Sequence, residues 1–430
     1  MNFLPNVIFA ITLILGIGFF ARNISKLKRN IALGKDVDVS GSTKIRWKNM
    51  ARIALGQSKM VRRPIAGILH VIVYVGFVII NIEVLEIIID GLFGTHRILS
   101  GIGSLYGVLI GTFEILAALV FVAVIIFWFR RNVVRIRRFM SAEMKGWPKQ
   151  DGNLILYFEI VLMGLFIIMN ATDVEFQSMN SGNIISQFLA PLFEDYNVHL
   201  IERAAWWMHI IGILIFLNYL YYSKHLHILL AFPNTYYGSV KPKGQFNNLE
   251  AVTNEVKLMM DPSIDPFAAS DDDGSTPDKF GASDVQDLNW VQLLNAYTCT
   301  ECGRCTSECP ANQTGKKLSP RKIMMDTRDR LVEVGANIDA NKGEFKADGK
   351  QLLGDYITNE ELWACTSCNA CVEACPISID PLSIILEMRR YLVMEQSAAP
   401  MELNNMMSNI ENNGAPWPYN QMDRLNWKNE

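Results

Sequence analysis

Five long apolar stretches fill the first half of the chain and predict membrane-spanning helices. They cover roughly residues 4–21, 65–89, 102–129, 154–171 and 204–220, and the last is expected to continue to residue 230. Each is as long, or nearly as long, as the about 20 apolar residues that a helix needs to cross a bilayer. Burial inside a large soluble protein is the alternative, but five such stretches in close succession favour the membrane. The first stretch lacks the basic start and the cleavage site of a signal peptide, so we expect it to be retained.

The basic residues between these stretches predict how the helices are oriented. Twelve Lys or Arg and two Asp lie within residues 22–63, and seven Lys or Arg with one Glu lie within 130–150. Residues 172–203 have the opposite balance, with one Arg against five Asp or Glu. Because short loops rich in Lys and Arg stay in the cytoplasm, we expect a multi-pass protein of the inner (cytoplasmic) membrane. Its N-terminus would lie outside, and the residues after 232 would lie in the cytoplasm. Segment 44–63 is interpreted either as an amphipathic helix on the inner membrane surface or as a solvated basic loop.

The second half of the chain is polar, and its pattern predicts short helices. Pro233 and Pro242 are expected to break the fifth helix and carry the chain off the membrane. Residues 261–284, rich in Asp, Pro, Ser and Gly, indicate an extended linker. Helices are predicted over 287–297, from Ser319 onward, after Thr358, and over 380–396. The fold class is therefore mainly α, with a five-helix membrane domain at 1–232, a linker or extended arm at 233–286, a helical domain at 287–398 and a tail at 399–430.

All eight cysteines of the chain lie in two runs of the helical domain, CTECGRCTSECP and CTSCNACVEACP. Each run has the spacing C-x2-C-x2-C-x3-C-P, which holds [4Fe–4S] clusters in two-cluster ferredoxins, where the fourth cysteine of a run ligates the other cluster. We therefore assign one cluster to Cys299, Cys302, Cys305 and Cys375, and the second to Cys365, Cys368, Cys371 and Cys309. Zinc sites would separate their C-x2-C halves further, and disulfides are disfavoured in the cytoplasm. The sequence thus predicts an α-helical dicluster ferredoxin domain whose task is electron relay.

Three histidines, His70, His209 and His227, are predicted to lie inside or at the ends of membrane helices. An imidazole in lipid is costly and suggests a function. On one continuous helix, His209 and His227 would share a face about 27 Å apart along the axis, and His70 lies at the depth of His227. A bis-histidine haem b between His70 and His227, near the cytoplasmic surface, is the resulting hypothesis. Its alternative is that the imidazoles only form hydrogen bonds between helices.

Carboxylates within the apolar stretches are candidates for quinone chemistry. Glu83 and Glu86 lie three residues apart in the second stretch and share one helix face. Quinone reduction takes up protons, and intramembrane carboxylates often serve proton paths, so both are quinone-site candidates. The further polar groups in or near the predicted helices are Asn81, Glu114, Glu159 and Asp173. For Glu86 and Asp173, a position at a helix end with the side chain reaching water is the alternative explanation.

The membrane half resembles the haem-b membrane subunit (gamma subunit) of respiratory nitrate reductases and, more closely, the membrane subunit of heterodisulfide reductases. The shared features are five helices, an outside N-terminus, and a fifth helix with H-x17-H and SKHLH at its end. In the nitrate reductase family, two haems are held by two histidines on helix 2 and two on helix 5. His70, His209 and His227 match three of these positions, and Ile80 occupies the fourth. The resemblance implies one haem b on His70 and His227. A second haem on His209 would need another partner, for which the candidates are His96 and His199.

The cysteine half resembles the dicluster iron–sulfur subunit of heterodisulfide reductases, including the wording LWACTSCNACVEACP. Residues 408–427 are similar to the segment that leads into a CCG-motif catalytic domain in fused members of that family, and no cysteine follows Cys375 here. The resemblance implies that a separate cytoplasmic redox protein, with a CCG domain or a flavin, docks at the tail and supplies the substrate site.

Together these features predict a membrane-bound electron-transfer subunit of a quinone-linked oxidoreductase complex. It would pass electrons between a cytoplasmic redox protein and menaquinone or ubiquinone through two [4Fe–4S] clusters and one or two haem b. The alternatives are a membrane-tethered ferredoxin with a haem-free anchor and a structural or assembly subunit. No nucleophile or general base stands out, so no catalytic residue is assigned. The net charge of −3 does not suggest a nucleic-acid partner; membrane lipid and quinone are expected instead.

Overall fold

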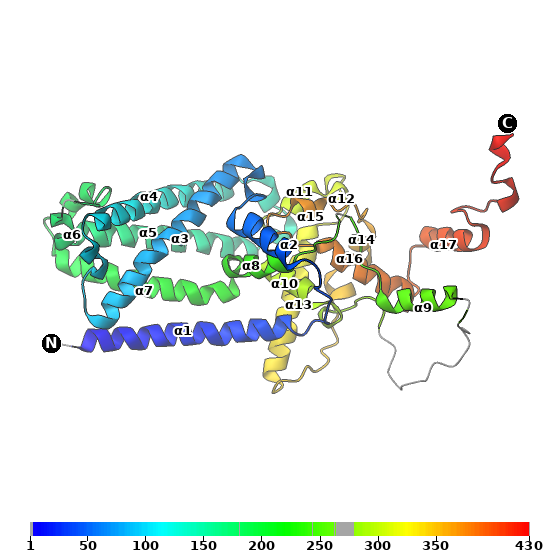
Figure 1. Ribbon diagram of the computed structural model, residues 1–430, viewed down its shortest axis with the longest axis horizontal. Coiled ribbons are helices and arrows are strands. Elements are labelled where there is room, and N and C mark those ends of the chain that lie inside the picture. The colour runs from blue at the N-terminus through cyan, green and yellow to red at the C-terminus, as the bar shows by residue number, and fades with distance from the viewer. Residues whose placement is uncertain (1–2, 180, 243, 262, 264–278, 430) are drawn as a thin grey trace.

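The chain forms a bundle of long helices followed by a smaller helical domain (Figure 1). The computed structural model describes residues 3–179, 181–242, 244–261, 263 and 279–429. Within these ranges, β pairing is confined to isolated bridges, Lys35 with Asn289 and Leu353 with Ile357. The prediction of a mainly α chain, with a five-helix bundle before a helical cysteine-containing domain, is confirmed.

Five helices are long and apolar enough to cross a membrane. They are α1 (Leu4–Ile31), α3 (Pro64–Phe93), α4 (Ser104–Asn132), α5 (Trp147–Thr172) and α7 (Val198–Tyr219), the last continued by a 3-10 turn to Tyr222. Helices α3, α4, α5 and α7 pack together, and α1 lies along their outside against α3 and α7 (Figure 1). Phe113 and Phe166 are fully buried between the helices. Gly76 allows α3 to approach α4 closely, because a β-carbon there would collide with Val120.

The fifth span does not continue as one helix to residue 230, and this part of the prediction is wrong. The backbone is extended at Ser223 (φ −112°, ψ 146°), and a separate helix, α8 (His227–Tyr237), follows. His209 in α7 and His227 in α8 therefore lie on different helices, so the expected shared face does not exist. Pro233 does not break the helix as predicted, because it lies inside α8.

A buried carboxylate explains why the chain turns at this point. Asp151 of α5 accepts hydrogen bonds from the hydroxyls of Tyr219 (2.5 Å) and Ser223 (2.6 Å) and from the backbone amide of Lys224 (3.2 Å). A helix end leaves backbone groups without intrahelical partners. Asp151 satisfies one of these groups and anchors two side chains of the turn, which stabilises the break.

The basic segment 44–63 is not one amphipathic helix. It contains α2 (Thr43–Met50), a π-helical turn (Ala51–Leu55) and a 3-10 turn (Met60–Arg62). Helix α2 packs against α8, where the rings of Trp47 and Tyr236 lie 5.2 Å apart. The segment is therefore folded against the end of the bundle.

Short helices make up the cysteine domain (residues 279–398). They are α10 (Trp290–Thr298), α11 (Arg304–Glu308), α12 (Pro310–Gln313), α13 (Pro320–Ala340), α14 (Asn359–Trp363), α15 (Ala370–Ala374) and α16 (Pro381–Arg390). The predicted helix starts are confirmed: Ser319 caps α13, and Thr358 forms a capping box with Glu361. Helices α9 (Glu250–Met260) and α17 (Met401–Asn413) lie outside this domain. The predicted linker 261–284 falls mostly outside the described residues.

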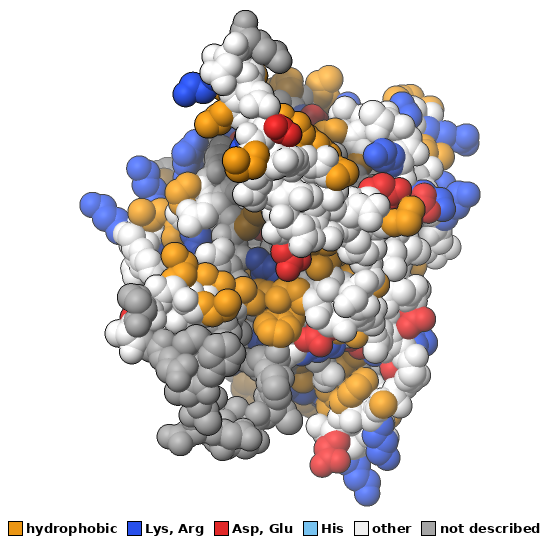
Figure 2. Space-filling model, turned by 90° about the vertical axis from the view of Figure 1, so that its right-hand side faces the viewer, with side chains coloured by type: hydrophobic (Ala, Val, Ile, Leu, Met, Phe, Trp, Pro, Cys, Tyr) orange, Lys and Arg blue, Asp and Glu red, His pale blue; other side chains and the backbone are white. Residues whose placement is uncertain are grey.

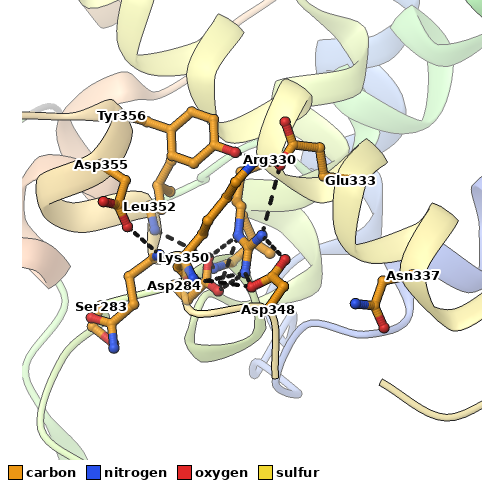
Figure 3. A network of polar contacts seen from close by, with 12 residues as sticks. Ser283, Asp284, Arg330, Glu333, Asn337, Asp348, Lys350, Leu352, Asp355 and Tyr356 are labelled. Atoms are coloured by element: carbon orange, nitrogen blue, oxygen red, sulfur yellow. Dashed lines mark hydrogen bonds and ion pairs between the residues drawn. The ribbon is translucent and has the colours of Figure 1, made fainter. Parts of the chain in front are cut away.

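A buried arginine joins three segments of the cysteine domain (Figure 3). The Arg330 guanidinium is fully buried and donates to Asp284 from Nε (3.0 Å) and from Nη2 (2.7 Å). Its Nη1 donates to Asp348 (2.6 Å), and Nη2 also donates to the Lys350 carbonyl (2.9 Å). Arginine suits this position because its planar set of donors matches carboxylates in pairs. The network fixes the start of the domain and the segment before α14 against α13.

Replacement of Arg330 by Met should destabilise the cysteine domain by about 3–5 kcal/mol, because the change leaves largely buried carboxylates without their cation. Denaturant unfolding of the full chain in detergent micelles, followed by tryptophan fluorescence, measures this loss. Lys317→Met is the matched control, since its ion pair with Glu360 is exposed on both sides and should contribute less than about 1 kcal/mol. Equal unfolding midpoints for R330M and the wild type would contradict this role of the network.

Candidate redox site

The two cysteine runs fold into loops with the same backbone pattern. In the first loop, Glu301 (φ 54°) and Gly303 (φ 70°) have left-handed conformations, and in the second loop Ser367 (φ 55°) and Asn369 (φ 63°) occupy the equivalent positions. Left-handed backbone is uncommon for residues other than glycine. Such residues direct successive N–H groups toward one concave side, an arrangement found at many Fe–S sites. The repeated backbone is therefore suited to two anionic groups.

The eight thiols form two sets of four, and each set takes three cysteines from one run and one from the other. By mutual proximity, the first set is Cys299, Cys302, Cys305 and Cys375, and the second is Cys365, Cys368, Cys371 and Cys309. Crossed ligation of two clusters requires this grouping. Among the described residues, no three or more His, Cys, Asp or Glu side chains gather around a single metal position. In a [4Fe–4S] cube each thiolate binds a different iron, so its ligands stand further apart than those of a single ion.

Burial keeps the free thiols protonated. It raises the pKa of Cys299 to about 12 and that of Cys375 to about 11, and adjacent thiols add to the increase. Backbone amides act in the opposite direction: the Ser367 N–H points at Cys365 Sγ (3.4 Å) and the Ile379 N–H at Cys375 Sγ (3.3 Å). Because a metal deprotonates a coordinating thiol outright, these donors are suited to metal-bound sulfur.

A buried ion-pair network joins the first loop to the helix bundle. Glu301 is 3% exposed and lies between Cys299 and Cys302 in the chain. Its carboxylate pairs with Lys224, just after the fifth span, and with Arg328 of α13 at 2.6 Å. Burial opposes ionisation of Glu301, but Lys224 and Arg328 outweigh burial and lower the pKa of its carboxyl. The charge is therefore retained, and it ties the loop to the point where the fifth span turns.

Two further arginines fix the cysteine domain to the basic loops. Arg304 donates to the carbonyls of Lys59 and Met60, both at 3.0 Å. Arg321 donates to the Arg138 carbonyl at 2.6 Å and pairs with a glutamate of the same loop. Segments 22–63 and 130–150, both rich in Lys and Arg, thus contact the cysteine domain and lie at the same end of the bundle.

The first set of thiols lies nearer the bundle than the second. Arg304 is close to Cys302 and Cys375 and also to His70 of α3. In the second set, Cys368 is exposed at the surface. The two sets therefore lie between the end of the bundle and the surface of the cysteine domain.

His70 and His227 meet at this end of the bundle. Their ring centroids are 6.4 Å apart, with 40° between the ring planes. Nδ1 of His227 lies 3.1 Å from the Lys224 carbonyl, whereas the buried Nδ1 of His70 has no hydrogen-bond partner within the described ranges. The ring of His225 lies 5.3 Å from that of His227. Three imidazoles thus gather beside the first set of thiols.

His209 lies elsewhere in the bundle, in a cavity of about 80 Å³ between α3, α4, α5 and α7. It is 2% exposed, and its Nδ1 has no hydrogen-bond partner in the described part of the chain. Glu159 of α5 lines the same cavity. The two histidines suggested as partners do not line it: His96 lies 3.2 Å from Asp173 in another cavity, and His199 is exposed.

The quinone-site candidates lie at the far end of the bundle, away from the cysteine domain. Glu83 and Glu86 of α3 line a cavity of about 170 Å³ that also contacts α1, the loop after α3 and the start of α7. Both carboxylates are buried. Glu86 accepts a hydrogen bond from the Leu99 amide (2.9 Å), while Oε2 of Glu83 has no partner among the described residues. Glu86 is therefore not the water-exposed residue of the alternative explanation.

The polar network beside this far-end cavity was not predicted from the sequence. Arg97 is 6% exposed and donates to Asp173 (2.7 Å) and to Asn170 (2.8 Å). Asn170 donates in turn to Glu114 of α4 (3.0 Å). In the sequence, Arg97 is one charge in a short loop between apolar stretches. Its burial depends on the packing of α3, α4 and α5, which no local pattern reveals.

Comparisons with known proteins agree on the nature of the cysteine domain. The sequence profile of the 4Fe-4S dicluster domain matches residues 298–379. The chain is 28% identical over 417 residues to the probable iron-sulfur-binding oxidoreductase FadF of Bacillus subtilis, covering 89% of this chain and 54% of that protein. It is 25% identical over 411 residues to the EtfAB:quinone oxidoreductase of Syntrophomonas wolfei, covering 88% and 53%. A probable membrane-anchored ferredoxin of Chromohalobacter salexigens is 33% identical over 171 residues, covering 36% and 25%.

The chain thus spans about half the length of the first two curated relatives. The heterodisulfide reductase family expected from the sequence is also similar over the cysteine domain. No solved structure matches the chain significantly. The matches and the helices together make the chain a membrane-anchored, multi-pass iron–sulfur electron-transfer protein, and the eight cysteines of the dicluster domain support two [4Fe–4S] clusters.

Removal of the Lys224 charge should loosen the first cysteine loop, because Glu301 would stay buried with one of its two cations missing. Breaking a buried pair costs up to about 3–5 kcal/mol. Hydrogen–deuterium exchange of residues 299–309 in Lys224→Met should therefore be faster than in the wild type. Lys26→Met is the control at the same interface, since its pair with Asp339 is about one-third exposed on both sides. Wild-type exchange in K224M would contradict the attachment.

Proposed function

We propose that the chain is a membrane-bound electron-transfer subunit between a cytoplasmic redox protein and the quinone pool. The observation that carries this proposal is the order of its sites. An exposed thiol set, a buried thiol set, a histidine pair and a far-end cavity succeed one another along the molecule. Electron transfer falls steeply with distance, so a relay needs such closely spaced stations. The relative named EtfAB:quinone oxidoreductase supports a quinone at one end of the path and a separate electron-carrying protein at the other.

Two [4Fe–4S] clusters are proposed to bind the two thiol sets. The first would be held by Cys299, Cys302, Cys305 and Cys375, and the second by Cys365, Cys368, Cys371 and Cys309. Bound there, each cube supplies a one-electron carrier. The crossed grouping of the thiols and the N–H groups directed at two sulfurs support the assignment. Lys224 and Arg304 hold the first set against the bundle.

A haem b is proposed between His70 and His227. Two metal–nitrogen bonds of about 2 Å and the radii of two imidazole rings add to about 6 Å, which agrees with the 6.4 Å between the ring centroids. The Lys224 carbonyl occupies Nδ1 of His227 and leaves Nε2 for a metal. Ligating histidines are commonly oriented in this way by a partner on the second nitrogen. Bound there, the haem supplies a one-electron carrier inside the membrane.

A second haem is proposed for the cavity at His209. The α3 residues of this cavity lie within 73–84, between His70 and the far-end cavity at Glu86. His70 and Glu86 are separated by 16 residues, about 24 Å along the helix, which is long for a single electron step. The unpartnered Nδ1 of His209 supports a ligand at this depth.

The far-end cavity at Glu83 and Glu86 is proposed as the site for menaquinone or ubiquinone. Its walls combine aromatic side chains, including Phe9 and Trp206, with buried polar groups, a combination typical of small-molecule sites. Because the loops rich in Lys and Arg contact the cysteine domain, the positive-inside rule favours a cytoplasmic cysteine domain. The quinone cavity would then lie near the outer surface of the inner membrane.

The cytoplasmic partner is proposed to bind the end of the molecule that carries the cysteine domain, where Figure 2 shows exposed hydrophobic side chains. In α17 and the tail, Met401 is 71% exposed, Trp417 59% and Met422 85%. Exposed apolar groups in such numbers mark interaction sites. A CCG-domain or flavin protein is the proposed partner, as the resemblance to heterodisulfide reductases implies.

A membrane-tethered ferredoxin with a haem-free anchor is the second candidate. The relative named a probable membrane-anchored ferredoxin favours it, over a match that covers 36% of this chain. In that case His70 and His227 would contact each other without binding iron.

Haem binding distinguishes the two candidates. We expect a b-type α-band in the reduced-minus-oxidised spectrum of the purified chain, together with about eight cluster irons, four for each cube. His70→Ala and His227→Ala should each lose the haem between them and keep the cluster irons, whereas His199→Ala, at an exposed position, should lose neither. Two haems per chain would require the His209 site. A wild-type protein with intact clusters and no b-type band would establish the anchored ferredoxin instead.

Crossed ligation predicts which cluster each fourth cysteine serves. Cys375→Ala should remove or convert the same electron paramagnetic resonance signal as Cys302→Ala, because both thiolates bind the first cluster. Cys309→Ala should instead act like Cys365→Ala. If Cys375→Ala and Cys365→Ala affect the same signal, each run holds its own cluster and the crossed assignment is wrong.

A further inference from the structure

The far-end cavity contains a histidine to which the proposed function gives no role. His96, in the loop after α3, lines this cavity together with Glu83 and Glu86. Its Nε2 lies 3.2 Å from Oδ2 of Asp173, and its Nδ1 lies 3.2 Å from Oε2 of Glu175. The His96 side chain is 36% exposed. The imidazole therefore stands at the rim, between the cavity and water.

The two carboxylates beside His96 differ in how firmly they are held. Asp173 is 5% exposed and accepts hydrogen bonds from Arg97 Nε (2.7 Å) and from the Phe176 amide (3.0 Å), where it caps α6 (Val174–Ser178). The Glu175 side chain is 69% exposed. One nitrogen of His96 is thus anchored to a fixed group, and the other faces a carboxylate on the surface.

The charges around His96 favour its protonated form. The hydrogen bond to Asp173 raises the pKa of His96 above its ordinary value of 6.5, although burial and Arg97 oppose the increase. Helix α1 contributes only uncharged groups to the cavity, Asn6 among them. The charged groups that face this region are Glu83, Glu86 and Asp90 of α3, Arg97 of the loop, Asp173 and Glu175 beside α6, and Glu202 and Arg203 of α7.

We propose that His96, positioned by Asp173, exchanges protons between water and a quinone ring bound in the far-end cavity. This inference rests on the proposed function. Reduction of the ring takes two electrons from a reduced iron–sulfur donor and two protons, and two O–H bonds form. Each proton leaves Nδ1 of His96 when that nitrogen exchanges Glu175 for a ring oxygen, and a proton from water replaces it at the rim. Oε2 of Glu83, buried without a partner among the described residues, remains to hydrogen-bond with the ring.

Two measurements on the full chain in nanodiscs separate quinone binding from proton exchange. Trp206 and Trp207 line the cavity, so menadione, a naphthoquinone, should quench their fluorescence. Rapid mixing of menadione with dithionite-reduced protein then measures quinone reduction across neutral pH. In the wild type the rate should fall as pH rises through a pKa above 6.5, because the imidazolium is the proton donor. His96→Gln should lower the rate roughly 100-fold and remove this inflection, with the quenching retained. His199→Gln, at an exposed histidine, should behave like the wild type.

The outcomes identify which proposal fails. A wild-type rate and pH profile in His96→Gln, with quenching intact, would overturn the role of His96 alone. Absence of both quenching and quinone reduction in the wild type would overturn the quinone site and this inference with it. If His96→Gln does not assemble, Asp173→Asn replaces it, because it keeps the imidazole but removes the hydrogen bond that raises its pKa. The inflection should then move to lower pH, and an unmoved inflection would contradict the positioning by Asp173.

Discussion

A carboxylate buried at the boundary between the two halves of the chain determines where the iron–sulfur domain stands. Glu301 lies inside the first cysteine loop, and a charge buried this deeply needs a partner. Lys224 of the membrane half and Arg328 of the cysteine domain supply it from opposite sides. Since electron transfer falls steeply with distance, a relay between the halves depends on this contact, which sets the separation between the first thiol set and the bundle.

Lys224 connects three parts of the proposed path. Its backbone amide bonds to Asp151, which stabilises the break in the fifth span. Its carbonyl lies 3.1 Å from Nδ1 of His227 and so orients that ring. Its ammonium group pairs with Glu301 in the first cysteine loop. A straight helix would direct these groups along its own axis or around it. The break therefore turns one residue into a junction between the membrane histidines and the thiols.

The sequence predicted those features that a local pattern encodes. The five spans follow from runs of apolar residues, the cysteine loops from their spacing, and the starts of α13 and α14 from Ser319 and Thr358. The break at Ser223 was missed because its cause, Asp151, lies on another helix. The burial of Arg97 was missed for the same reason, since its partners come from α5 and the segment after it. Position along the chain indicated the depth of the histidines, but only the packed structure shows that His70 meets His227 while His209 lies in a separate cavity.

A continuous electron path from the thiols into the membrane is tested most directly by the reoxidation of the clusters by a quinone. Protein in nanodiscs is reduced with dithionite, freed of excess reductant, and mixed anaerobically with a menaquinone analogue while the iron–sulfur absorbance is followed. We expect rapid reoxidation in the wild type and its loss in His227→Ala, whose clusters dithionite should still reduce. Reoxidation of this variant at the wild-type rate would contradict a path through the histidine pair.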